Sequence, residues 1–68
     1  MTRLRVNGVE EDVAAATVSE LLSNRGIDPR ARFLAVAVNG AVLRRAEWPG
    51  RPLMPGDDVE IVRPLQGG

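Results

Sequence analysis

Residues 17–22, Thr-Val-Ser-Glu-Leu-Leu, decide the fold of this 68-residue chain because they start its only predicted helix. Thr17 and Glu20 have the spacing of a capping box, in which the Thr hydroxyl accepts from the Glu20 N–H and the Glu carboxylate accepts from the Thr17 N–H. The three apolar residues of this stretch fall at positions i, i+3 and i+4, on one helical face. Gly26 can supply the left-handed residue after the helix, so a short amphipathic helix is predicted over residues 17–25.

A β-hairpin is predicted on the N-terminal side of this helix. Residues 3–6 alternate polar and apolar side chains, as expected for a half-buried strand. Asn7-Gly8 is a strong two-residue hairpin signal, because a type I′ turn requires positive φ at both central positions. Residues 9–13 then form the returning strand.

Three more strands are predicted on the C-terminal side. Residues 34–39 alternate large and small apolar side chains, and Asn39-Gly40 is a second hairpin turn that leads into a short strand at 41–43. Residues 44–57 contain three Pro and two Gly, which predicts turns and loop. Residues 59–63 form the last strand.

Two strands, a helix and three strands are the element order of an α+β fold of the ubiquitin-like β-grasp type. We expect a mixed sheet of four to five strands with one helix packed on one face. The first and last strands should pair in parallel, since the intervening helix supplies the required crossover. Residues 1–63 form the predicted domain. Because Pro64 cannot donate to a sheet ladder, residues 64–68 are predicted to be a flexible tail that ends in Gly-Gly.

The composition excludes most catalytic chemistry. The chain has no His, Cys, Lys or Tyr, so it lacks the usual general bases and nucleophiles, and we expect neither an enzyme nor a metal site. Nine Arg balance nine acidic residues, which gives no electrostatic reason to expect nucleic acid or an acidic membrane surface as a partner. No apolar segment has the length of a membrane span or a signal peptide, which predicts a cytoplasmic protein.

The remaining charged and aromatic residues have simple structural interpretations. Two acidic runs, Glu10-Glu11-Asp12 and Asp57-Asp58, could be metal ligands or solvated surface charges. We expect solvated charges, because a metal site needs several ligands that converge on one point. Residues Arg44, Arg45 and Arg51 are expected to be solubilising loop charges, with a docking role as the alternative. Trp48 should cover the open end of the core, with a partner contact as the alternative.

The chemistry is therefore expected at the C-terminus, where Gly67 and Gly68 are the last two residues. Glycine has no side chain, so such an end can enter a narrow enzyme channel with any φ. A terminal carboxylate has a pKa of about 3.5, so it is ionised at neutral pH and is a poor electrophile. Another protein must first convert it to a mixed anhydride with ATP, after which the carbonyl can take a sulfur nucleophile and become a thiocarboxylate. Gln66 and Leu65 would contribute to recognition of the tail.

A recognition surface is predicted on the sheet face opposite the helix. It would include Ala35, Ala37, Val62 and the nearby Arg5. An apolar patch framed by charge is typical of a transient partner site. An ordinary half-polar outer sheet face is the alternative, and the residues alone leave both open.

The whole chain resembles the ThiS family, the sulfur carriers of thiamine biosynthesis. The similarity rests on the order and spacing of several short motifs: Val6-Asn7-Gly8, Thr17-Val18-Ser19-Glu20-Leu21-Leu22, Ala35-Val36-Ala37-Val38-Asn39-Gly40, Val42-Leu43-Arg44 with Trp48, Pro55-Gly56-Asp57, Val59-Glu60-Ile61-Val62 and Gly67-Gly68. Each motif alone is weak, and the combination with the terminus is what makes the resemblance specific.

The resemblance implies a carrier with no bound cofactor. A ThiF-like adenylyltransferase would adenylate Gly68 with ATP, a persulfide would supply the sulfur, and the thiocarboxylate would donate it to a ThiG-like thiazole synthase. Two alternatives remain at this point: a carrier of the MoaD type, the small subunit of molybdopterin synthase, and a β-grasp interaction module in which the two glycines are incidental. The segment 64–66 is not diagnostic of the sulfur acceptor.

Overall fold

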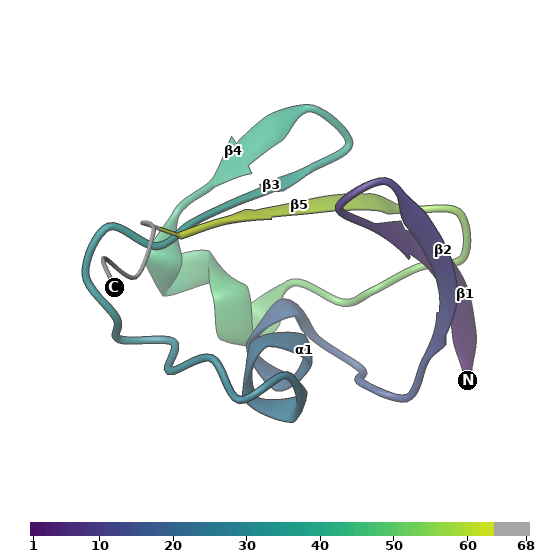
Figure 1. Cartoon of the computed structure of the whole chain (residues 1–68), viewed down its shortest axis with the longest axis horizontal. Helices are drawn as coiled ribbons and strands as arrows, with labels where there is room; N and C mark the ends of the chain where they lie inside the picture. Colours follow the sequence, from purple (N-terminus) through teal and green to yellow (C-terminus); the bar gives the residue numbers. More distant parts are fainter. Residues whose placement is uncertain (64–68) are drawn as a thin grey trace, which may run out of the picture.

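Five strands form one mixed sheet in the order β2-β1-β5-β3-β4, and helix α1 packs on one face of it (Figure 1). The structure is a computed structural model that describes residues 1–63. This arrangement confirms the predicted mixed sheet with one α-helix packed on one face. No helix in the described part of the chain has the length and apolar character needed to cross a bilayer. The elements are β1 Thr2–Val6, β2 Val9–Val13, α1 Val18–Asn24, β3 Ala35–Val38, β4 Ala41–Leu43, the 3₁₀ helix η1 Arg45–Gly50 and β5 Asp58–Val62.

Both Asn-Gly pairs make the predicted hairpin turns. At Asn7-Gly8 the φ angles are 50° and 83°, and at Asn39-Gly40 they are 53° and 83°. These left-handed values are those that a type I′ turn requires. The turns join β1 to β2 and β3 to β4 in antiparallel pairs.

The asparagine side chains of the two turns also hold the central strand β5. Asn7 Oδ1 accepts a hydrogen bond of 2.8 Å from the Ile61 N–H, and Asn39 Oδ1 accepts one of 2.9 Å from the Asp58 N–H. β5 pairs in parallel with β1 and antiparallel with β3, as predicted for the parallel pair. The two turns therefore fix the last strand from both sides.

Helix α1 begins at its predicted cap. Thr17 Oγ1 accepts from the Glu20 N–H at 3.2 Å. The second half of the predicted capping box is wrong, because the Glu20 carboxylate accepts from the N–H of Ala16, at 3.1 Å, instead of from that of Thr17. Gly26 has φ 74° and ends the helix as expected.

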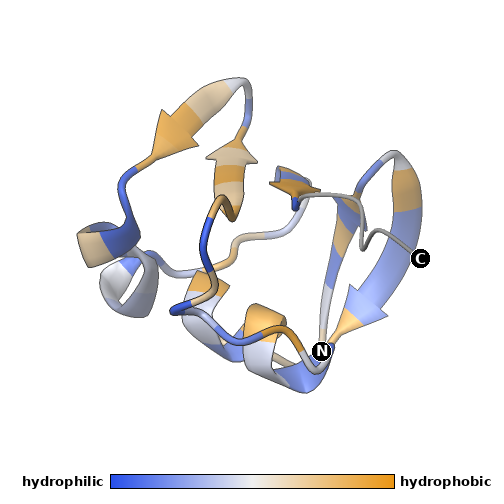
Figure 2. Ribbon diagram, turned by 60° about the vertical axis from the view of Figure 1, so that its left-hand side comes forward, coloured by the Kyte–Doolittle hydropathy of each residue, from blue (hydrophilic) through white to orange (hydrophobic). Residues whose placement is uncertain are grey.

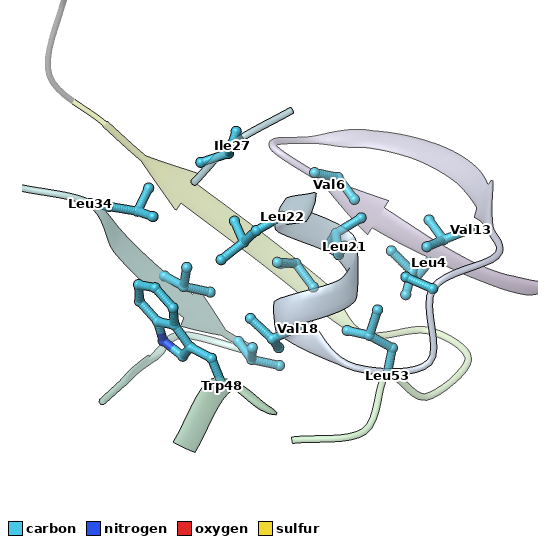
Figure 3. Packing of buried hydrophobic residues seen from close by; sticks show 14 residues of the cluster. Leu4, Val6, Val13, Val18, Leu21, Leu22, Ile27, Leu34, Trp48 and Leu53 are labelled. Atoms are coloured by element: carbon cyan, nitrogen blue, oxygen red, sulfur yellow. The ribbon is translucent and has the colours of Figure 1, made fainter. Parts of the chain in front are cut away.

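The core lies between the sheet and the two helices, and Figure 3 shows its side chains converging from all of them. Trp48 is 2% exposed and donates its Nε1–H to the Leu43 carbonyl at 3.0 Å, which confirms it as a cover of the core. Since a buried indole N–H needs a partner, this bond fixes the ring. The buried apolar side chains are Leu4, Val6, Val13, Ala15, Val18, Leu21, Leu22, Ile27, Leu34, Val36, Val38, Trp48, Leu53 and Val59.

The segment predicted to be only turns and loop contains the 3₁₀ helix η1. This helix contains Trp48. Two hydrogen bonds close its first turn: the Glu47 N–H donates to the Arg44 carbonyl at 2.8 Å, and the Glu47 carboxylate accepts from the Arg44 N–H at 3.3 Å. Short 3₁₀ turns are frequent connectors. The many Pro and Gly residues of this segment concealed it.

Arg45 is not a free loop charge, which corrects the prediction. Its guanidinium lies over the Trp48 ring, 4.8 Å from the centroid, and donates to the carbonyls of Pro29 and Ala31, the latter at 2.8 Å. Arg45 therefore joins the loop between α1 and β3 to η1. The stacking adds a cation–π contribution to the hydrogen bonds.

Glu11 is also not simply solvated. It lies opposite Leu4 in the β1–β2 register, on the face of the sheet that carries the helix, and forms an ion pair with Arg25 at the end of α1. Glu10 and Asp12 point to the other face and are exposed, as predicted. Because side chains alternate along the strand, Glu11 faces the helix, and its ion pair with Arg25 helps to hold the helix against the sheet.

Candidate functional site

The end of β5 is the point from which the C-terminal residues continue. β5 lies between β1 and β3, ends at Val62, and is followed by Arg63, the last residue that the structure describes (Figure 1). The predicted reactive residue Gly68 and the predicted tail residues Gly67, Gln66 and Leu65 lie outside the described residues. Their roles remain predictions.

Three of the four predicted surface residues lie together beside this point. In the β3–β5 register Ala35 is opposite Val62, and Ala37 is opposite Glu60. Directly opposite residues of an antiparallel pair share one face of a sheet. Because the alternate residues of β3 are buried against the helix, Ala35 and Ala37 face away from it, and Val62 does so with 56% of its surface exposed.

Val42 extends this surface, although the sequence reasoning did not select it. It lies opposite Ala37 in the β3–β4 pair and is 79% exposed. Figure 2 shows β3 and β4 as mostly apolar strands, in contrast to the hydrophilic β2. The sequence could have indicated Val42, because successive side chains of a strand point to opposite faces and Val42 is the middle residue of the predicted strand 41–43. We call the four side chains Ala35, Ala37, Val42 and Val62 the outer apolar patch.

Arg5 faces the same side of the sheet but does not border the patch. It pairs with Asp58 at the beginning of β5, four residues before Val62. At a strand rise of about 3.3 Å per residue, this offset corresponds to about 13 Å along the strand. The exposed Glu60 lies between them, so the structure separates Arg5 from the other three predicted residues.

Asp57 is the only buried charged side chain within residues 1–63, contrary to the prediction that it is solvated. Its carboxylate accepts from the Met54 N–H at 2.9 Å and from the Asn39 amide at 3.0 Å, and it lies 3.4 Å from an Arg51 nitrogen. Burial raises the pKa of this carboxyl, but the hydrogen bonds and the Arg51 charge together outweigh burial and hold the pKa below its ordinary value. Arg51 is thus a structural partner and not only a loop charge.

Within residues 1–63 the features that could serve a function are surfaces for binding; reactive side chains do not gather at any point there. A depression of about 410 Å³ beside β1 is lined by charges of both signs, of which Arg3 and Glu10 pair with each other at 3.2 Å. No group of three Asp or Glu within residues 1–63 is close enough to hold a metal ion. The Thr17 hydroxyl is used as the helix cap. The outer apolar patch is the surface that stands out beside the end of β5.

Comparisons with known proteins agree on one family. The model of the ThiS family matches residues 4–68. The sulfur carrier protein ThiS of Thermus thermophilus is 35% identical over 63 residues, which cover 93% of this chain and 95% of that protein. A crystal structure of the thiamine biosynthesis protein ThiS from Geobacter metallireducens is 34% identical and superposes with a TM-score of 0.77, covering 98% of this chain and all of the other. A solution structure of a thiamine biosynthesis protein from the same organism gives 34% identity and a TM-score of 0.78, covering 98% of this chain and 88% of the other.

Proposed function

Because this chain belongs to the ThiS family of ubiquitin-like β-grasp proteins and is a sulfur carrier of thiamine biosynthesis, not a catalyst, we propose that it carries the sulfur as a thiocarboxylate on Gly68. The observation behind this proposal is the residue inventory. With no Cys anywhere in the sequence, no thiol of this chain can carry sulfur as a persulfide. The sulfur must then be carried on an activated carboxylate, and the one at Gly68 is the carboxylate that a chain end without side chains can bring into an enzyme channel.

The carboxylate must be activated before sulfur can replace one of its oxygens. A Gly68 oxygen attacks the α-phosphorus of ATP and pyrophosphate leaves, which gives an acyl adenylate. A persulfide sulfur then attacks the carbonyl carbon and displaces AMP, forming an acyl disulfide. A second thiol cleaves the S–S bond, so that one sulfur stays on Gly68 as the thiocarboxylate and the other becomes part of a disulfide. The carrier itself binds no cofactor in this scheme.

Three partners follow from these steps. A ThiF-like adenylyltransferase supplies the adenylate, a persulfide donor supplies the sulfur, and a ThiG-like thiazole synthase accepts it. We assign the outer apolar patch to contact with these enzymes, supported by the exposure of Val62 and Val42 next to the end of β5. Exposed apolar side chains gathered on one face are typical of protein interaction sites. The dependence on ATP supports a cytoplasmic location.

The activation step is tested by ATP–pyrophosphate exchange with a ThiF-like enzyme. The wild-type carrier should stimulate exchange, whereas Gly68→Ala and a variant with one residue added after Gly68 should not, because the active-site channel is expected to admit only a bare glycine end. Circular dichroism should show that both variants fold like the wild type. Stimulation at the wild-type rate by the extended variant would contradict the requirement for a free Gly68 terminus.

A further inference from the structure

Phe33 has a backbone conformation and an exposure that the fold does not explain. Its φ is 62°, in the left-handed region, and 80% of its surface is exposed. A bulky residue at positive φ is an outlier that costs conformational energy, and Gly or Asn would tolerate the position better. Such outliers gather at functional sites. Since the ring is mostly exposed, burial does not compensate for the strained backbone.

Phe33 lies near the end of the sheet where β5 ends. Phe33 stands two residues before Ala35, which is opposite Val62 in the antiparallel β3–β5 pair, so the loop into β3 reaches the edge of the outer apolar patch (Figure 1). Its backbone is fixed on both sides. Arg45 donates to the Ala31 carbonyl before it, and the buried Leu34 anchors the chain after it. The backbone that carries the exposed ring is therefore held by contacts on both sides of Phe33.

The sequence on both sides of Phe33 is rich in positive charge although the whole chain is neutral. Residues 29–46 contain four Arg and no acidic residue. Of these, Arg32 is next to Phe33, is exposed, and makes no ion pair with any residue in the described range 1–63. Phe and Arg are both enriched at protein interfaces relative to the rest of the surface. The complement of this pair is an apolar pocket with carboxylates at the rim.

The reaction proposed at Gly68 limits which enzymes can cover this surface. Gly68 is five residues after Arg63, and a fully extended chain of five residues spans at most about 18 Å. An enzyme that takes the Gly68 carboxylate into its active site must therefore contact the carrier around the end of β5. Adenylation is the first step of the proposed sequence and acts on the unmodified carboxylate, so the adenylating enzyme has to recognise the body of the carrier itself.

Given the thiocarboxylate function proposed above, we infer that Phe33 is a docking residue for the adenylating enzyme, with its ring in an apolar pocket of that enzyme and Arg32 beside acidic groups at the rim. The ring adds to the outer apolar patch and orients the carrier so that the tail enters the active site. It touches neither ATP nor the reacting carboxylate. Its loss should weaken binding and leave the chemical step unchanged.

The test is ATP–pyrophosphate exchange as a function of carrier concentration for Phe33→Asn, since Asn removes the ring and tolerates positive φ. We expect the KM for the carrier to rise about tenfold, which corresponds to about 1.4 kcal/mol, with kcat retained and Tm equal or higher. Arg32→Gln should raise KM at low salt, with an effect that fades at high salt. Met54→Gln, at an exposed apolar side chain near the other end of β5, is the matched control and should leave KM unchanged.

The outcomes separate this inference from the proposed function. A wild-type KM in Phe33→Asn, with normal exchange by the wild-type carrier, would overturn the docking role alone. A large fall in Tm would show that the ring supports the fold, and a defect confined to sulfur transfer to the thiazole synthase would overturn the assignment to the adenylating enzyme. If the wild-type carrier itself stimulates no exchange, the proposed function fails, and the inference fails with it.

Discussion

Replacing Asp57 with Ala should destabilise the fold more than any other substitution of a charged residue in the described part of the chain. The carboxylate closes its own turn by accepting from the Met54 N–H, and it ties this turn to the β3–β4 hairpin through the Asn39 amide and to Arg51 after η1. Asp57→Ala leaves all three donors without this acceptor in a largely buried position. The Asn39 side chain also supports the first residue of β5 by accepting from the Asp58 N–H, so part of that support is lost.

The size of the effect follows from the contacts. Hydrogen bonds to a charged group contribute about 1.5–3 kcal/mol each, and removal of one partner of a buried charge pair costs about 3–5 kcal/mol. These terms overlap, so we expect Asp57→Ala to lower the free energy of unfolding by about 3–4 kcal/mol. A domain of this length has a total stability of about 3–10 kcal/mol, so the variant should be marginally stable.

Urea unfolding followed by Trp48 fluorescence measures this loss directly. Trp48 is the only tryptophan and is buried, so its emission reports on unfolding of the core. Asp58→Ala is the matched control, because the Asp58 side chain is exposed and only its backbone N–H and carbonyl bond to Asn39. Equal midpoints for the two variants would refute the structural role of the Asp57 carboxylate.

The pH dependence of the free energy of unfolding provides a second test of the role of Asp57. Because the pKa of Asp57 is lower in the folded than in the unfolded protein, its contribution is complete above the unfolded value, about 3.9, and is lost as pH falls through the folded value. Wild-type stability should therefore fall below about pH 4, and the Asp57→Ala variant should show a shallower fall. Parallel pH profiles for the two proteins would contradict the lowered pKa.

Three further predictions concern the turns, the core and the tail. Gly8→Ala should lower the free energy of unfolding by about 1–2 kcal/mol in urea titration. The φ of Gly8 is 83° and an added Cβ would meet no atom within 4 Å, so backbone strain is the only cost. An unchanged free energy of unfolding would contradict the type I′ turn. Trp48→Phe should cost about 1–3 kcal/mol by calorimetry, since it removes the hydrogen bond to the Leu43 carbonyl and weakens the contact with Arg45; a neutral result would mean that the cover is dispensable. Deletion of residues 64–68 should barely move Tm, and a large drop would show that the tail supports the core.

The sequence was sufficient for the elements whose signals are local. Asn-Gly pairs require left-handed backbone, so both hairpins could be located from two residues each. The Thr17 cap and the period of the apolar residues located the helix. The alternation in residues 34–39 predicted which side chains of β3 face the core. Each of these signals lies within a few residues of the structure it predicts.

What the sequence reasoning missed depends on contacts between distant residues. Asp57 follows a Pro-Gly turn and has the sequence context of an exposed residue, but its partner Asn39 is 18 residues away. Arg45 has the context of a loop charge until the carbonyls of Pro29 and Ala31 are placed beside it. The strained φ of Phe33 has no local signature, because Phe normally avoids that region. The tertiary fold alone determines these features.

The choice between sulfur carriers did not come from the fold. Carriers of the MoaD type share the β-grasp architecture and the terminal chemistry, and one fold can serve unrelated functions. The match of the ThiS family model over residues 4–68 and the 35% identity to a ThiS protein identify the family. They also set aside a plain interaction module, because the match includes the terminal glycines.

Mass spectrometry of the loaded carrier tests the central claim most directly. The wild-type protein is incubated with a ThiF-like enzyme, Mg-ATP and a persulfide source, and its intact mass is measured before C-terminal fragments are sequenced. We predict that one oxygen is replaced by sulfur and that the change maps to Gly68. An unchanged mass with an active enzyme, or sulfur located on any other residue, would contradict the thiocarboxylate mechanism.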